Sequence, residues 1–221
     1  MSIEIWAYIH ILLFVFWLGA DVGVFTAAVM AKSPQRSFET RANLLRLAMI
    51  VDLFPRVSFA LIFPVGLQLT DALGIHPITP AMFAFGWGLA IVWLPLIFIG
   101  FFMEGKPVAN VAGTVQLGLE GVVGLLFTVV GLNSLATGAP LGEPWFAWKI
   151  MLFGLVFWSA MAIDLCFRPF IAPFMEIGRE GSTPEREEAV ARAINNTLVA
   201  VLTLYTLIAV IAFLGRVKPI L

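Results

Sequence analysis

Long apolar segments separated by short polar ones dominate this chain. The segments fall at residues 3–31, 44–73, 82–103, 108–137, 145–167 and 189–215. Each exceeds the roughly 20 residues that a helix needs to cross about 30 Å of hydrocarbon. The pattern therefore predicts an all-α protein, a polytopic integral membrane helical bundle of about six transmembrane helices that forms a single domain over residues 1–221.

The composition supports a membrane protein and excludes some partners. Of 221 residues, 61% are hydrophobic and 12% are charged, and the mean hydropathy is +0.99. Such a chain leaves no room for a soluble catalytic domain, and membrane lipid is its expected partner. The net charge of -1 provides no basic patch, so nucleic acid is not expected to bind.

The distribution of cations predicts an orientation. The first connection carries Lys32, Arg36 and Arg41, and the fifth is rich in arginine, whereas the second and fourth have no Lys or Arg. The positive-inside rule then makes the odd connections cytoplasmic. We expect a protein of the bacterial inner membrane with both termini on the outer, periplasmic side, although Arg216 and Lys218 go against this rule.

Local signals mark one helix start and several helix interruptions. Thr183 followed by Pro184 and acidic residues is typical of a capped helix N-terminus, so the last helix should begin before its apolar segment. Pro55, Pro64 and Pro95 are predicted to interrupt the second and third spans. Broken helices of this kind are typical of transporters.

The first span carries polar side chains at helical spacing. Steps of seven and four residues bring His10, Trp17 and Asp21 onto one side of a helix. An intramembrane ionisable residue predicts a functional site. This combination of imidazole, indole and carboxyl groups is the main sequence evidence for function.

Charged residues of three spans fall at similar predicted depth. They are Asp21, Asp52, Arg56 and Glu120. A charged side chain in the membrane costs at least about 2.5–3.5 kcal/mol, so Arg56 is predicted to pair with Asp21 or Glu120. Both a structural ion pair and a proton path or anion site are compatible with this cluster.

Small and polar residues of the fourth span share one helical face. Gly113, Gln116, Glu120, Gly124 and Gly131 follow spacings of three, four, four and seven. Such a face lets either a neighbouring helix or a flat ligand approach the backbone closely.

A second polar group is predicted near the outer surface. It contains His10, Asn133, Trp145, Trp148 and Lys149. Histidine is the usual axial ligand of protein-bound haem iron, and an ammonium can hold a propionate. A hydrogen-bonded packing role for His10 and an interfacial position for Lys149 beside tryptophans are the alternatives.

Several short motifs resemble one family. They lie at residues 10–19, with histidine, Trp and Gly; 56–67, with Arg56, Pro64 and Gly66-Leu67; 145–149; 192–195; and 216–219. In this order they resemble the HemJ-type protoporphyrinogen oxidases and the related CopD-type copper-resistance membrane proteins. This chain differs by two further helices within residues 75–137 and by Asn196 where the HemJ pattern has an acidic residue.

The resemblance implies a membrane protein that binds haem b, with His10 as the axial metal ligand and Lys149 as a functional partner. HemJ-type proteins oxidise protoporphyrinogen to protoporphyrin and pass electrons to the membrane pool. The leading hypothesis is a haem b-binding redox protein that acts on porphyrin or quinone. Its candidate catalytic residues are Lys149, Arg56, Glu120 and Asp21, and its candidate cofactor contacts are His10, Trp17, Phe14, Trp148 and Asn133.

Two other classes of function stay open. One is a transporter or permease, in the manner of a copper exporter, although eight methionines without a Met-x-x-Met cluster and the lone Cys166 provide no copper-site spacing. The other is an accessory subunit of a larger membrane complex, and the chain is also compatible with a homo-oligomer.

Overall fold

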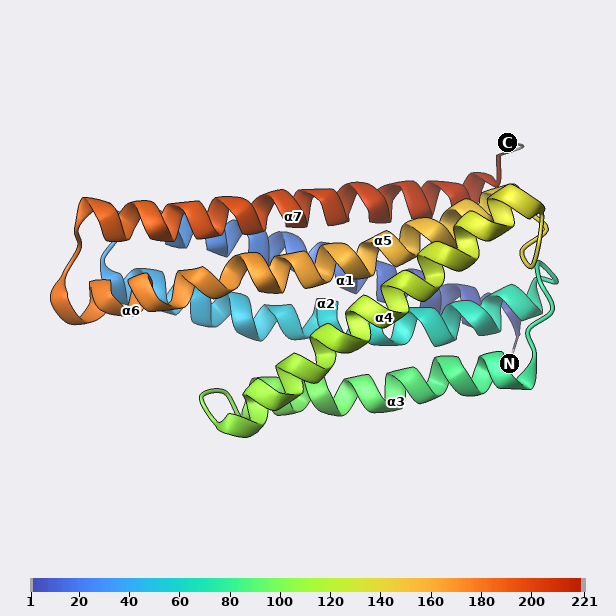
Figure 1. Ribbon diagram of the computed structural model, residues 1–221, viewed down its shortest axis with the longest axis horizontal. Coiled ribbons are helices and arrows are strands. Elements are labelled where there is room, and N and C mark those ends of the chain that lie inside the picture. Colours follow the sequence, from blue (N-terminus) through green and yellow to red (C-terminus); the bar gives the residue numbers. More distant parts are fainter. Residues whose placement is uncertain (1, 220–221) are drawn as a thin grey trace. The chain divides into compact units, whose positions relative to one another are not determined.

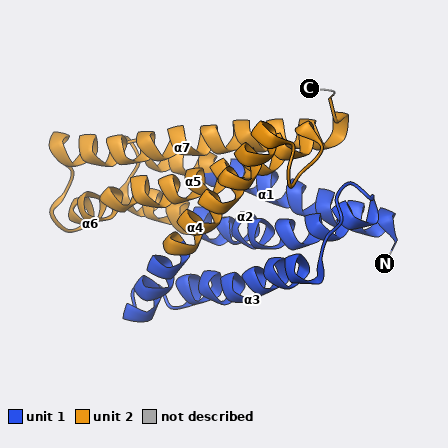
Figure 2. Ribbon diagram, turned by 45° about the vertical axis from the view of Figure 1, so that its right-hand side comes forward, with its two compact units in different colours: residues 1–24, 47–116 blue, residues 25–46, 117–221 orange. Residues whose placement is uncertain are grey.

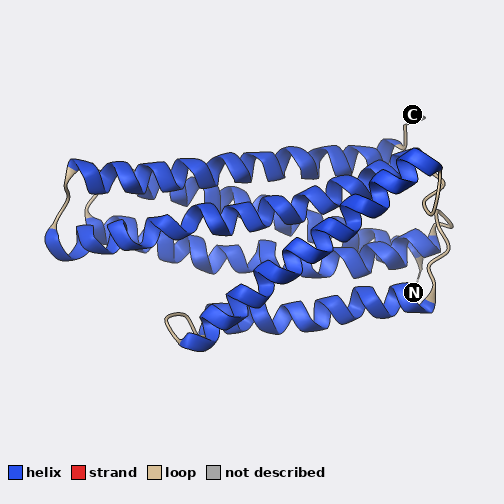
Figure 3. Cartoon of the chain, in the orientation of Figure 1, coloured by secondary structure: helices blue, strands red, loops and turns tan. Residues whose placement is uncertain are grey.

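The computed structural model of the protein describes residues 2–219, which form helices and no strand (Figure 1, Figure 3). The helices are α1 (Ile3–Ala31), α2 (Phe38–Ala72), α3 (Pro80–Phe102), α4 (Pro107–Thr137), α5 (Pro144–Phe167), the 3-10 helix η1 (Arg168–Phe170), α6 (Ile171–Glu180) and α7 (Pro184–Val217).

Six helical stretches within residues 2–219 are long and apolar enough to cross a membrane. The fifth is the continuous run Pro144–Glu180, which joins α5, η1 and α6. The predicted all-α class with six membrane-spanning helices is therefore confirmed. The apolar surfaces of these helices are suited to contact with lipid.

Two helices begin at least a helical turn before their apolar segments. The helix α2 starts at Phe38, whereas the apolar pattern placed its start at residue 44, because the polar residues Glu39 and Thr40 are also helical. The helix α7 starts at Pro184, as its capping signal predicted. The Thr183 hydroxyl accepts a hydrogen bond from the backbone N–H of Arg186 at 3.4 Å.

The predicted interruption of two spans by proline is wrong. Pro55 and Pro64 lie inside the continuous helix α2, and Pro95 lies inside the continuous helix α3. Proline removes one backbone donor, but packing against neighbouring helices maintains a membrane helix around it. Pro55 and Pro64 are both buried, in agreement with this explanation. The feature that favoured a transporter is therefore absent from these two helices.

Contacts divide the described chain into two compact units (Figure 2). The first contains residues 1–24 and 47–116, and the second contains residues 25–46 and 117–221. The prediction of a single domain over residues 1–221 stays a prediction.

In the first unit, α1 packs antiparallel to α2. Trp17 contacts Phe59 with ring centroids 4.9 Å apart, and Phe16 stacks on Phe54 at 6.0 Å. The helix α3 packs on α2 at Gly86, where an added Cβ would lie 2.6 Å from Leu67 Cδ1. Large side chains of α2 thus fill the space that a small residue of α3 leaves.

In the second unit, α5 packs against both α4 and α7, and α7 runs alongside α5 (Figure 1). A separate apolar cluster lies where α6 meets the first turns of α7. Its buried members are Phe170, Phe174, Ile177, Val190, Ala193 and Ile194. This cluster gives the long fifth connection its own core.

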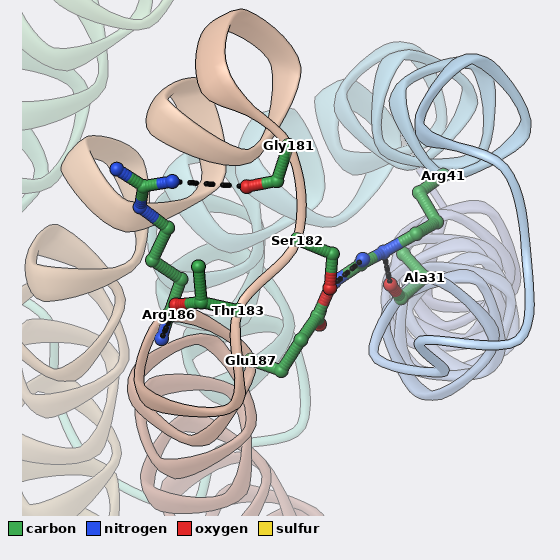
Figure 4. Close-up of polar contacts among 7 residues, drawn as sticks. All are labelled: Ala31, Arg41, Gly181, Ser182, Thr183, Arg186 and Glu187. Atoms are coloured by element: carbon green, nitrogen blue, oxygen red, sulfur yellow. Dashed lines mark hydrogen bonds and ion pairs between the residues drawn. The ribbon is translucent and has the colours of Figure 1, made fainter.

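A buried arginine ties the same end of the second unit together (Figure 4). Arg41 is 1% exposed, and its Nε donates to the carbonyl oxygen of Ala31 at 2.7 Å. Its Nη1 and Nη2 donate to the two carboxylate oxygens of Glu187 at 2.9 and 3.0 Å. Ser182 donates a further hydrogen bond to Glu187 at 2.8 Å. Because its donors are satisfied in this way, we assign Arg41 a structural role.

Candidate functional site

In the first unit, His10 of α1 lies directly against Gly66 of α2. A Cβ added to Gly66 would lie 3.2 Å from His10 Cε1 and 3.7 Å from Nδ1, whereas Nε2 is more than 4 Å from that point. The Nδ1 atom is buried. The glycine therefore provides the space that the imidazole edge occupies, and Nε2 is the ring nitrogen farther from Gly66.

An aromatic stack follows His10 along the same side of α1. Trp17 is 5% exposed and packs on Phe59, whose ring lies 5.7 Å from that of Trp93 in α3. The predicted cofactor contact Trp17 is thus part of the core of the first unit. Phe14, the other predicted contact on this helix, is half-buried.

An ion pair lies farther along α2. Arg56 Nε contacts Asp52 Oδ2 at 2.5 Å, one helical turn away. The side chains of Arg56 and Asp52 are 35% and 26% exposed, so both are only partly buried. Asp52 is thus a partner of Arg56 within the predicted charged cluster. The predicted pairing of Arg56 with Asp21 or Glu120 stays a prediction.

The antiparallel contact between α1 and α2 also shows which turn of α2 lies beside Asp21. His10 faces Gly66, Trp17 faces Phe59, and Gly23 lies near Val51, whose Cγ1 would be 3.7 Å from an added Cβ. The register therefore places Asp21 level with the helical turn that contains Arg56. Two carboxylates and one guanidinium lie in this part of the first unit.

The glycine face of α4 packs against α5. A Cβ at Gly131 would lie 2.5 Å from the backbone nitrogen of Met151, and one at Gly124 would lie 3.1 Å from the carbonyl oxygen of Gly154. Of the two alternatives for this face, close helix packing is confirmed at both glycines. No neighbour lies within 4 Å of an added Cβ at Gly113.

Glu120 and Gln116 are the polar members of that face, and both are buried at 2% and 7% exposure. The catalytic role of Glu120 stays a prediction. The burial of its carboxyl group still sets Glu120 apart, because a buried charge is costly unless its surroundings compensate it.

The other predicted site residues belong to the second unit. Asn133 is exposed, and its side-chain N–H donates to the carbonyl oxygen of Ala139 at 2.8 Å, which secures the connection between α4 and α5. Trp148 is 40% exposed, and Lys149 is half-buried with its Nζ against Gly215 of α7. His10 belongs to the first unit, so these residues are described apart from it.

In the sequence, Gly66 stands out only as part of a family motif, and no pattern singles out Phe59 or Trp93. A small residue such as glycine inside an apolar span signals close helix packing. The sequence alone does not reveal which residue of another helix faces that glycine.

Protein ligands for a metal do not gather in the described part of the chain. Residues 2–219 contain no group of three or more His, Cys, Asp or Glu side chains that could hold a metal ion. A site with several protein ligands is therefore not supported in this range, whereas a cofactor that needs one protein nitrogen requires only a single histidine.

Comparisons with protein-family models, with curated proteins and with solved structures find no match for this chain. The fold and the described side chains define the class as a helical integral membrane protein with six potential spans.

Proposed function

We propose that the protein is a haem b-binding redox membrane protein of the bacterial inner membrane, with His10 as the axial ligand, acting on a porphyrin or a quinone. The observation that carries the proposal is the position of His10, an imidazole within a membrane-spanning helix that packs against a glycine of the next helix. The resemblance of residues 10–19 and 56–67 to the HemJ-type and CopD-type proteins favours the same function.

The donor chemistry of the first unit fits haem b. Haem iron needs only one or two axial ligands from the protein, and neutral imidazole is its usual ligand. Since the Cε1 and Nδ1 edge of His10 lies against Gly66, Nε2 is the candidate donor. Gly66 would then restrict the rotation of the ring and so orient the donor atom, as supporting contacts do at metal sites.

The remaining residues of the first unit would support this chemistry. Haem b supplies one-electron transfer when bound. Trp17, Phe59 and Trp93, from α1, α2 and α3, pack on one another about two helical turns along α1 from His10 and would exclude water from that part of the unit. Asp21 and Asp52 would hold or move protons that accompany electron exchange, because intramembrane carboxylates commonly serve as proton relays, and the permanent charge of Arg56 would stabilise the ionised carboxylate of Asp52.

The test is a pair of oxidised and dithionite-reduced absorption spectra of the purified protein after expression with a haem precursor. The chain has two histidines, so His10→Ala and His76→Ala form a complete set of single histidine variants. His76 lies in the connection between α2 and α3 and serves as the matched control.

We expect a b-type spectrum in the wild type and in His76→Ala, and its loss in His10→Ala. A wild-type protein that shows no haem absorption after reconstitution would contradict the proposal. Haem that persists in His10→Ala and disappears in His76→Ala would move the ligand to the other histidine and would contradict the assignment of His10.

A further inference from the structure

Three cations gather where the start of α5 meets the end of α7 in the second unit. Lys149 Nζ lies 2.8 Å from the position that a Cβ on Gly215 would occupy, and Arg216 follows that glycine directly. Lys218 Nζ lies 5.4 Å from the centroid of the Trp145 ring. Lys149, Arg216 and Lys218 are called the cationic cluster below.

The cationic cluster has no anionic partner among residues 2–219. None of its three members forms an ion pair with a described carboxylate, and Lys218 lies over Trp145, one helical turn before Lys149 on α5, so two like charges share this end of the unit. Other cations of the protein behave differently, since Arg41 and Arg56 are both paired with carboxylates. Exposed loop cations such as Lys106 need no partner, but Lys149 is half-buried in a membrane-spanning helix.

Two backbone features distinguish this region. The N-terminus of α5 adds to its positive potential, and the conformation of Lys218 directs that side chain. The helix α5 begins at Pro144, and the side chain of the preceding Glu143 makes no hydrogen bond to the first turn, whereas Thr79 and Thr183 cap α3 and α7. An uncapped helix N-terminus has a partial positive charge. Lys218 adopts a left-handed conformation with φ 48°, which is unfavourable for a residue other than glycine, and its side chain extends over Trp145.

We propose that the cationic cluster binds a phosphate-bearing anion, which would bridge Lys149 and Lys218 and offset their repulsion. A phosphate group offers several strong acceptor oxygens, and ammonium and guanidinium groups are its usual protein partners. The proposal goes beyond the haem proposal and does not depend on it.

The phosphate can come from a phospholipid headgroup or from free phosphate. The neighbouring side chains favour a lipid source. Trp148, which precedes Lys149, is 40% exposed, and Trp145 is buried beneath Lys218. Tryptophans of this kind are enriched at headgroup level, and cationic pockets between membrane helices bind anionic headgroups.

The experiment compares lipid retention by the full-length protein in native mass spectrometry. The protein is released from nanodiscs that contain equal amounts of phosphatidylglycerol and phosphatidylcholine. The variants are Lys149→Gln, Lys218→Gln and Lys149→Arg, and Lys106→Gln is the matched control that removes one charge from an exposed connection. In a second arm, inorganic phosphate or chloride at equal ionic strength is added to the detergent-solubilised protein, and its melting temperature is measured.

We expect the wild type, Lys106→Gln and Lys149→Arg to prefer phosphatidylglycerol. Lys149→Gln and Lys218→Gln should each reduce the preference by about tenfold, which is the typical effect of losing one charge-assisted hydrogen bond. Retention by Lys149→Arg also shows that a charge, rather than an intact lysine, is needed. A phosphate-specific rise in melting temperature without lipid preference would support free phosphate as the source.

Two outcomes would overturn the proposal. One is equal retention of both lipids by the wild type together with no phosphate-specific stabilisation. The other is unchanged lipid preference in folded Lys149→Gln and folded Lys218→Gln. The oxidised and reduced absorption spectra of the same samples are recorded in parallel, so failure of the haem proposal is distinguished from failure of this one.

Discussion

Gly66 in the first unit and Gly131 in the second are both helix-interior glycines in contact with another helix, but they face different groups. Gly66 faces the imidazole of His10, whose Cε1 lies 3.2 Å from the position of an added Cβ. Gly131 faces the backbone of α5, where the nitrogen and Cα of Met151 lie 2.5 and 2.6 Å from that position. One glycine accommodates a side chain with ligand chemistry, and the other accommodates a helix backbone.

This difference explains why a series of glycines does not by itself identify a ligand wall. The face of α4 satisfied the spacing expected for a flat ligand, yet α5 covers it at Gly124 and Gly131. Gly66 belongs to no such series in the sequence, but it contacts His10, a residue whose side chain can bind a metal. The partner of each glycine, rather than the glycine pattern, distinguishes packing from a candidate site.

The largest effect should follow from Gly131→Ala. A backbone cannot move aside as a side chain can, so the added methyl group should separate α4 from α5 and lower the unfolding free energy by about 1–3 kcal/mol. Reversible unfolding in mixed micelles, followed by circular dichroism, measures this loss. Unchanged stability would show that the close contact between α4 and α5 is not essential to the fold.

Gly66→Ala should change stability less than Gly131→Ala does, and it should change the haem absorption spectrum more. The imidazole can shift by a few tenths of an ångström, so we expect a change in unfolding free energy within about 1 kcal/mol. The displaced ring should alter haem absorption or reduce haem content. A variant with a wild-type spectrum and full haem content would indicate that Gly66 does not orient the ligand.

Gly118→Ala should have the smallest effect and serves as the control on α4. No atom outside its own helix segment lies within 4 Å of an added Cβ there. Alanine at this position should leave stability unchanged or raise it by at most about 1 kcal/mol, since it reduces backbone freedom in the unfolded chain. The same unfolding assay measures it, and marked destabilisation would show that packing contacts are not what distinguishes Gly131.

The sequence predicts most of the fold because apolar length and capping signals act locally. The end of α1 at Ala31 and the start of α7 at Pro184 follow from local residues alone. The start of α2 at Phe38 was missed because polar residues of a helix that extends beyond the apolar segment resemble a loop. The effect of Pro55 was misjudged because packing, which depends on other helices, maintains α2 around it.

Long-range pairs explain what the sequence could not predict at the candidate site. The distance between Arg41 and Glu187 in the chain, 146 residues, leaves no local signal for their ion pair. His10 and Gly66 likewise meet only because α1 and α2 are antiparallel in one register. The sequence identified His10, Trp17 and Arg56 as unusual, and the structure supplied their contacts with Gly66, Phe59 and Asp52.

The most direct test of the central claim is imidazole rescue of His10→Gly, followed by absorption spectroscopy in the oxidised and reduced states. Removing the side chain should abolish the b-type spectrum, and added imidazole should restore it by occupying the vacated space beside Gly66. His76→Gly, treated in the same way, should keep its spectrum and show no response to imidazole. Haem binding that survives in His10→Gly without imidazole would contradict the assignment of His10 as the ligand.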